Sequence, residues 1–86
     1  METTAQLEEI VREIVAAVTG ADRSSIDSAT SMASLNLDSL SIVSIVSLCR
    51  ARFETEFETS EILDLYLAED FGDFVAAITE TIERHR

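Results

Sequence analysis

The sequence contains no proline and only two glycines, so few of its 86 positions interrupt a helix. It has no tryptophan, its aromatic fraction is 6%, and no stretch alternates apolar and polar residues over the length of a strand. Because 47% of its residues are hydrophobic, one small core can form. These features predict a single all-α domain that spans residues 1–86.

Long apolar runs are missing as well. No stretch reaches the roughly 18 apolar residues that a membrane span needs. The N-terminal residues lack the basic region and apolar run of a secretory signal. Cys49 is the only cysteine and lies on the apolar side of a predicted helix, which favours a buried role and leaves no internal disulfide. We therefore expect a cytoplasmic protein without a membrane segment.

Basic residues are few, with six arginines against 17 acidic residues and a net charge of −11. Such a chain repels nucleic-acid phosphates and anionic membranes, so neither is an expected partner. Eight acids lie between Glu54 and Asp73, where no basic residue occurs. Because the calcium-loop pattern Asp-x-Asp-x-Asp-Gly is absent, these acids are expected to form a solvated surface and no metal site.

The spacing of apolar residues predicts four helices. The first runs from about Thr3 to Val18, with Thr3 and Gln6 at the spacing of a capping box and Gly20 placed to end it. The third is short, at about 59–67, and its expected buried side is Ile62, Leu63 and Tyr66. The fourth runs over about 70–84, with Asp70 as its cap and an apolar stripe of Phe71, Phe74, Val75, Ile78 and Ile82.

A long loop, Ala21–Leu37, leads to the second helix. It is rich in serine, threonine and aspartate, and its isolated apolar residues are expected to pin it to the core: Ile26, Met32 and Leu35. The second helix is fifteen residues long and begins at Asp38-Ser39-Leu40. Its core face is expected to hold Ile42, Ile45, Val46, Cys49 and Phe53.

Ser39 lies off that core face, in the first turn of the helix. Unpaired backbone N–H groups and the positive end of the helix dipole meet there, so an anion attached to the hydroxyl is favoured. The plain alternative is that Asp38 and Ser39 only start a helix, as such residues often do.

The order of these elements resembles that of the acyl carrier proteins. Residues 32–40, MASLNLDSL, are similar to the family's aromatic-x-x-Leu-Gly-x-Asp-Ser-Leu segment. Phe53 matches the aromatic residue that closes the family's second helix, and Phe71-Gly72-Asp73 is similar to its Val-Gly-Asp segment. Asn36 stands where the family usually has glycine, and asparagine tolerates the left-handed backbone that such a turn needs.

The resemblance implies a small four-helix bundle with a long loop after the first helix and a short third helix. It implies that a phosphopantetheinyl transferase attaches 4′-phosphopantetheine from coenzyme A to Ser39. Asp38 assists the attachment, and Mg²⁺ is needed only in that step. The thiol of the arm then holds an acyl or aminoacyl group as a thioester, so the protein is a monomeric carrier and no enzyme.

The outer face of the second helix indicates which biosynthetic pathway the carrier serves. Carriers of fatty-acid synthesis usually present glutamates there, whereas this face has no acid beyond Asp38. A neutral, partly apolar face suits polyketide or nonribosomal peptide assembly, and Asp38 before the serine favours an acyl group. The residues expected to dock partners are Leu40, Val43, Ser44, Ser47 and Leu48.

We therefore expect a free-standing acyl carrier of polyketide or related natural-product biosynthesis. Its expected partners are the transferase, an acyl- or aminoacyl-loading enzyme, and a ketosynthase, acyltransferase or condensing enzyme. Two alternatives stay open: a peptidyl or aminoacyl carrier of nonribosomal peptide assembly, and an unmodified helical interaction module.

A hydrolase that uses Ser39 is not expected. The only histidine, His85, lies in the last three residues, where disorder is usual. The sequence also has no Gly-x-Ser-x-Gly motif.

Overall fold

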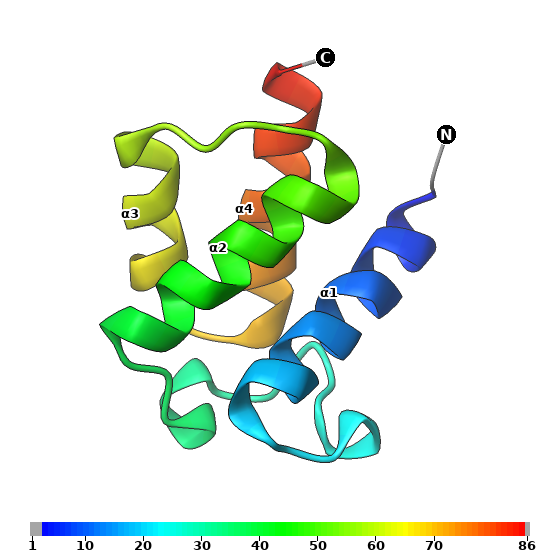
Figure 1. Cartoon of the computed structure of the whole chain (residues 1–86). Coiled ribbons are helices and arrows are strands. Elements are labelled where there is room, and N and C mark those ends of the chain that lie inside the picture. Colours follow the sequence, from blue (N-terminus) through cyan, green and yellow to red (C-terminus); the bar gives the residue numbers. More distant parts are fainter. Residues whose placement is uncertain (1–2, 86) are drawn as a thin grey trace.

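The computed structural model describes residues 3–85, which form four α-helices and confirm the all-α prediction. The helices are α1 (Thr4–Thr19), α2 (Ser39–Phe53), α3 (Thr59–Leu67) and α4 (Phe71–Arg84). In Figure 1, α2 crosses in front of α4, and α1 and the short α3 lie on opposite sides of α2. None of the helices in the described residues combines the length and apolar character that crossing a bilayer requires.

The ends of α1 form as the sequence predicts. The Thr3 N–H donates to Gln6 Oε1 at 2.7 Å, and the Gln6 N–H donates to Thr3 Oγ1 at 3.2 Å, which completes a capping box. Gly20 ends the helix with φ 76°, in the left-handed region, and its N–H donates to the Ala16 carbonyl at 2.8 Å.

The core is built from one face of each long helix. The predicted faces of α2 and α4 are confirmed, with Phe53 only partly buried. Phe71 and Phe74 are fully buried at its centre. Burying one such side chain stabilises the fold by about 1.5–3 kcal/mol. The buried apolar residues of the three long helices are Leu7, Val11 and Val15 (α1), Ile42, Ile45, Val46 and Cys49 (α2), and Phe71, Phe74, Val75, Ile78 and Ile82 (α4).

The long connection between α1 and α2 contains two short 3₁₀ turns, η1 (Arg23–Ser25) and η2 (Met32–Leu35). Ile26 and Met32 are buried and Leu35 is partly buried, so all three hold the loop to the core as expected. The loop is also paired by its backbone with the segment that enters α4. The Met32 N–H donates to the Glu69 carbonyl at 3.0 Å, and the Phe71 N–H donates to the Thr30 carbonyl at 2.9 Å.

The burial predicted for α3 is wrong. Its bounds agree with the expected range, but Leu63 is 54% exposed and Tyr66 is 43% exposed. Ile62 is only partly buried. The buried residues of α3 are Leu65 and, unexpectedly, Glu61.

Glu61 is the exception among acids that were expected to be solvated, because only 1% of it is exposed. Its carboxylate accepts the Glu58 N–H at 2.8 Å and lies 2.7 Å from Arg84 Nη1 and 2.8 Å from His85 Nε2. Burial alone raises the pKa of Glu61, but these hydrogen bonds and charges together hold the pKa below its ordinary value. His85, in the last three residues of the chain, thus contacts the first turn of α3.

Candidate functional site

Asp38 begins α2 as its N-cap. Its backbone is extended, and its carboxylate accepts the Ser41 N–H at 2.8 Å, which satisfies one of the unpaired amides of the first turn. This hydrogen bond, with a smaller contribution from the Ser41 hydroxyl, holds the pKa of Asp38 below its ordinary value. The carboxylate is therefore ionised at neutral pH.

Asn36 provides the turn that leads into this helix start. Its φ is 53° and its ψ is 41°, so it adopts the left-handed conformation that the sequence predicted for the position usually held by glycine. Its N–H donates to the Ala33 carbonyl at 3.2 Å and closes η2.

Ser39 is the first residue of α2 and is exposed to solvent. Its hydroxyl can therefore be reached by another protein. The start of the helix carries a partial positive charge that favours a bound phosphate, whereas the charge of Asp38 opposes one. The helix start attracts a phosphate and the Asp38 carboxylate repels it. A phosphate attached covalently to Ser39 stays in place despite this opposition, whereas a free phosphate would be held only by the difference between the two effects.

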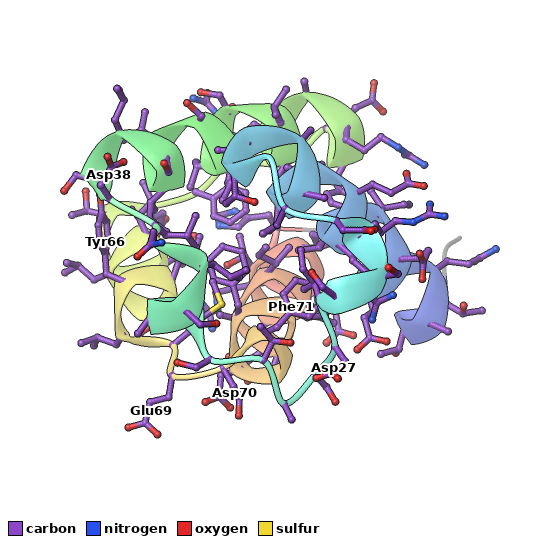
Figure 2. The ribbon with its side chains drawn as sticks, turned by 90° about the horizontal axis from the view of Figure 1, so that it is seen from below. Asp27, Asp38, Tyr66, Glu69, Asp70 and Phe71 are labelled. Atoms are coloured by element: carbon purple, nitrogen blue, oxygen red, sulfur yellow. The ribbon has the colours of Figure 1, made fainter. Side chains whose placement is uncertain are left out.

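Tyr66 of α3 contacts the start of α2. Its hydroxyl lies 3.4 Å from the backbone carbonyl oxygen of Ser39, to which it donates a long hydrogen bond. Figure 2 shows Tyr66 beside Asp38, at the start of α2. Tyr66 was predicted to lie on the buried side of α3, although a tyrosine commonly keeps its polar end in water, and this preference could have corrected the prediction.

A pocket of about 460 Å³ lies between η2, α2 and α3, next to this helix start. Its volume falls within the roughly 300–1,000 Å³ of typical ligand clefts. Apolar side chains from all three elements and from Leu37, just before α2, line it: Met32, Ile42 and Leu65, with Tyr66 in the wall. No local pattern in the sequence predicts this pocket, because its wall joins residues more than thirty positions apart.

The outer face of α2 exposes apolar side chains, as expected. Leu40 is 74% exposed, and Val43 and Leu48 are also exposed. Ser47 is exposed and Ser44 is partly buried, so the five predicted docking residues form a neutral surface. Toward the end of the helix, Arg50 is paired with Glu56 at 2.9 Å.

Two other kinds of site find no support. Within residues 3–85, no three His, Cys, Asp or Glu side chains are arranged to hold a metal ion. His85 binds Glu61, at the other end of α3 from Tyr66. It is therefore engaged elsewhere and does not serve as a base for Ser39.

A family model described as a phosphopantetheine attachment site matches residues 9–81 of the chain. The matched stretch includes the helix start at Asp38-Ser39, the pocket beside it and nearly all of the core. A comparison with curated proteins gives no match.

Proposed function

The chain belongs to the family of phosphopantetheine-carrying domains, and from this premise we propose that Ser39 is its attachment residue and that the protein is a free-standing acyl carrier. Members of this family are carriers, not catalysts, and bear a covalently attached 4′-phosphopantetheine. They interact with the transferase that modifies them and with biosynthetic enzymes. The assignment of Ser39 and of the pathway is our proposal.

The observation that carries the proposal is an exposed serine at the first position of α2. A phosphodiester needs a hydroxyl that reaches the active site of the modifying enzyme. Asp38 is fixed by its cap hydrogen bond and is ionised, so it can orient a Mg²⁺ ion during attachment. When bound, the arm supplies a thiol that holds the carried group as a thioester.

The neutral face of α2 supports an acyl carrier of polyketide or related natural-product biosynthesis. Its apolar side chains fit partners that dock through apolar contact, and we propose Leu40, Val43, Ser44, Ser47 and Leu48 as that docking surface. The preceding Asp38 supports an acyl group over an aminoacyl group. A ketosynthase, an acyltransferase or a condensing enzyme is then the expected partner.

Cys49 does not interfere with the thiol of the arm. Cys49 is the only cysteine of the chain and is fully buried, and burial raises the pKa of its thiol to about 12. It therefore does not compete with the arm for acyl groups. A cytoplasmic location, where thiols stay reduced, is part of the proposal.

The test is modification of the protein by a broad-specificity phosphopantetheinyl transferase with coenzyme A and Mg²⁺, followed by intact mass. We expect the mass of one phosphopantetheine to be added to the native protein and none to Ser39→Ala. Ser41→Ala, which removes a hydroxyl one half-turn away, is the matched control and should be modified fully. No mass gain in the native protein would favour an unmodified interaction module, and a gain in Ser39→Ala would move the attachment to another residue.

A further inference from the structure

Glu61 is a buried charge that the proposed function does not use. Only 1% of the residue is exposed, although it lies in the first turn of α3. Its carboxylate lies 2.7 Å from Arg84 Nη1 and 2.8 Å from His85 Nε2, both at the end of α4. A buried carboxylate stays ionised only where cations and hydrogen bonds compensate for the lost water. The end of α4 therefore supplies the charges that allow Glu61 to be buried.

The two cationic partners respond differently to pH. A guanidinium such as that of Arg84 keeps its charge, whereas a histidine gains or loses its charge between about pH 5 and about pH 8. His85 is the only histidine of the chain. Burial raises the pKa of the Cys49 thiol to about 12, so Cys49 does not titrate in that range. A neutral imidazole can still donate a hydrogen bond from Nε2, so loss of the proton removes the charge at Glu61 and not the contact.

The other charged groups around the cluster are exposed. Glu58, the N-cap of α3, is exposed and donates its backbone N–H to the buried carboxylate at 2.8 Å. On α4, Glu80 lies 4.0 Å from Arg84, and its side chain is 68% exposed. In the connection before α3, the exposed Glu56 is paired with Arg50. Water screens these charges more than it screens the buried carboxylate.

We propose that Glu61, Arg84 and His85 form a proton-sensitive clamp, which holds the first turn of α3 to the end of α4 more tightly when His85 is protonated. A charge-assisted hydrogen bond is roughly twice as strong as a neutral one. Protonation therefore favours the clamped state, and this advantage is lost as the pH rises through the histidine range. At higher pH α3 stays on α4, because Leu65 is buried and Arg84 keeps its charge.

The clamp acts on a helix that reaches the start of α2. Near the other end of α3, the Tyr66 hydroxyl lies 3.4 Å from the Ser39 carbonyl oxygen. The same helix exposes Leu63 and Leu67. Opening of the clamp therefore loosens an exposed apolar helix beside Ser39, whether or not the serine bears an arm. The proposal does not depend on the proposed function.

The experiment measures hydrogen exchange of the backbone amides of α3 at about pH 5 and about pH 8, on either side of the histidine range. Each observed rate is divided by the rate of an unstructured peptide of the same sequence, and α1, which has no residue in the cluster, is the internal reference. Rapid mixing with mass spectrometry covers amides that exchange fast at the higher pH. We expect the protection of α3 relative to α1 to be about fivefold lower at the higher pH.

Two variants test the assignment to the cluster. His85→Gln keeps a hydrogen-bond donor but cannot take up a proton, so α3 should have the lower protection at both pH values. Glu61→Gln removes the carboxylate charge and should also abolish the dependence on pH. Asp64→Asn is the matched control, because it removes an exposed acid of the same helix outside the cluster. It should keep the dependence of the native protein.

Three outcomes contradict the proposal. It is wrong if the relative protection of native α3 does not depend on pH, if His85→Gln keeps the native dependence, or if Asp64→Asn abolishes it. Should Glu61→Gln fail to fold, His85→Gln decides the question, because that variant leaves the ion pair of Arg84 with Glu61 in place.

Discussion

Two helices of this molecule begin with the same aspartate cap but in different surroundings. Asp38 caps α2 and Asp70 caps α4, and each carboxylate accepts the N–H three residues later at 2.8 Å. The next residue differs in both type and burial. Ser39 is exposed at the start of α2, whereas Phe71 is fully buried at the start of α4. An aspartate cap alone therefore does not distinguish an attachment site from an ordinary helix start.

The surroundings of the two starts explain the difference. The α1–α2 connection lies across the start of α4, and the Gly72 N–H donates to the Ser28 carbonyl at 2.9 Å. A Cβ atom at Gly72 would lie 3.1 Å from that carbonyl oxygen, so glycine permits this close approach. At the corresponding position of α2, Leu40 is 74% exposed. The same loop thus covers one helix start and leads into the other, which stays open to partners.

The largest expected effect concerns the first residue of each helix. Phe71→Ala leaves a cavity in the centre of the core and should lower the free energy of unfolding by about 3–5 kcal/mol. Ser39→Ala removes only an exposed hydroxyl and should change it by less than about 0.5 kcal/mol. Urea denaturation followed by far-UV circular dichroism measures both values. If both variants lost the same free energy of unfolding, the first residues of α2 and α4 would contribute equally to stability, contrary to their different burial.

The second prediction concerns the second residue of α2. Leu40→Asp places a charge on the proposed docking surface and should slow acyl loading by a partner enzyme about tenfold, without loss of helicity. Leu63→Asp makes the same change at an exposed leucine of α3 and should leave the loading rate near that of the native protein. Loading rates from intact mass measure both. If Leu40→Asp loads normally, partners dock elsewhere, and a steep fall of the native rate with salt would point to the acidic segment.

The sequence predicted most of the fold because α1 and α4 have clear apolar stripes and because the three long helices have local caps. Thr3 with Gln6, Gly20 and Asp38 act within a few residues of their own positions, so the sequence alone predicts them. The position of Ser39 at the start of α2 was likewise predicted from its neighbours, whereas its role as the attachment residue came from the family resemblance and stays a proposal. These features depend on neighbouring residues and not on the packing of distant segments.

The sequence could not predict the environment of α3. Apolar residues occur around most of this nine-residue helix, so no single stripe indicates which side is buried. The burial of Glu61 depends on Arg84 and His85, which lie 23 and 24 residues later in the chain. The contact of Tyr66 with Ser39 spans 27 residues, and the pocket is lined by residues from Ser31 to Glu69. Each of these features needs the tertiary structure.

The smallest expected effect concerns the charge of the α2 cap. Asp38 has a pKa below its ordinary value of 3.8, first because of the Ser41 N–H and then because of the Ser41 hydroxyl. A carboxylate with a lowered pKa in the folded state stabilises the protein fully above its unfolded pKa. That stabilisation is lost as the pH falls through the folded pKa.

Asp38→Asn keeps the hydrogen-bond acceptor and removes only the charge, so it isolates this contribution. At pH 7 the native protein should unfold at a slightly higher temperature than the variant, and the difference should shrink as the pH falls below 3.8. Thermal unfolding followed by circular dichroism at several pH values measures the difference. Ser44→Ala, on the same helix but away from the cap, should differ from the native protein by an amount that does not change with pH. A difference for Asp38→Asn that stays constant down to low pH would mean that the charge of Asp38 contributes nothing to the cap.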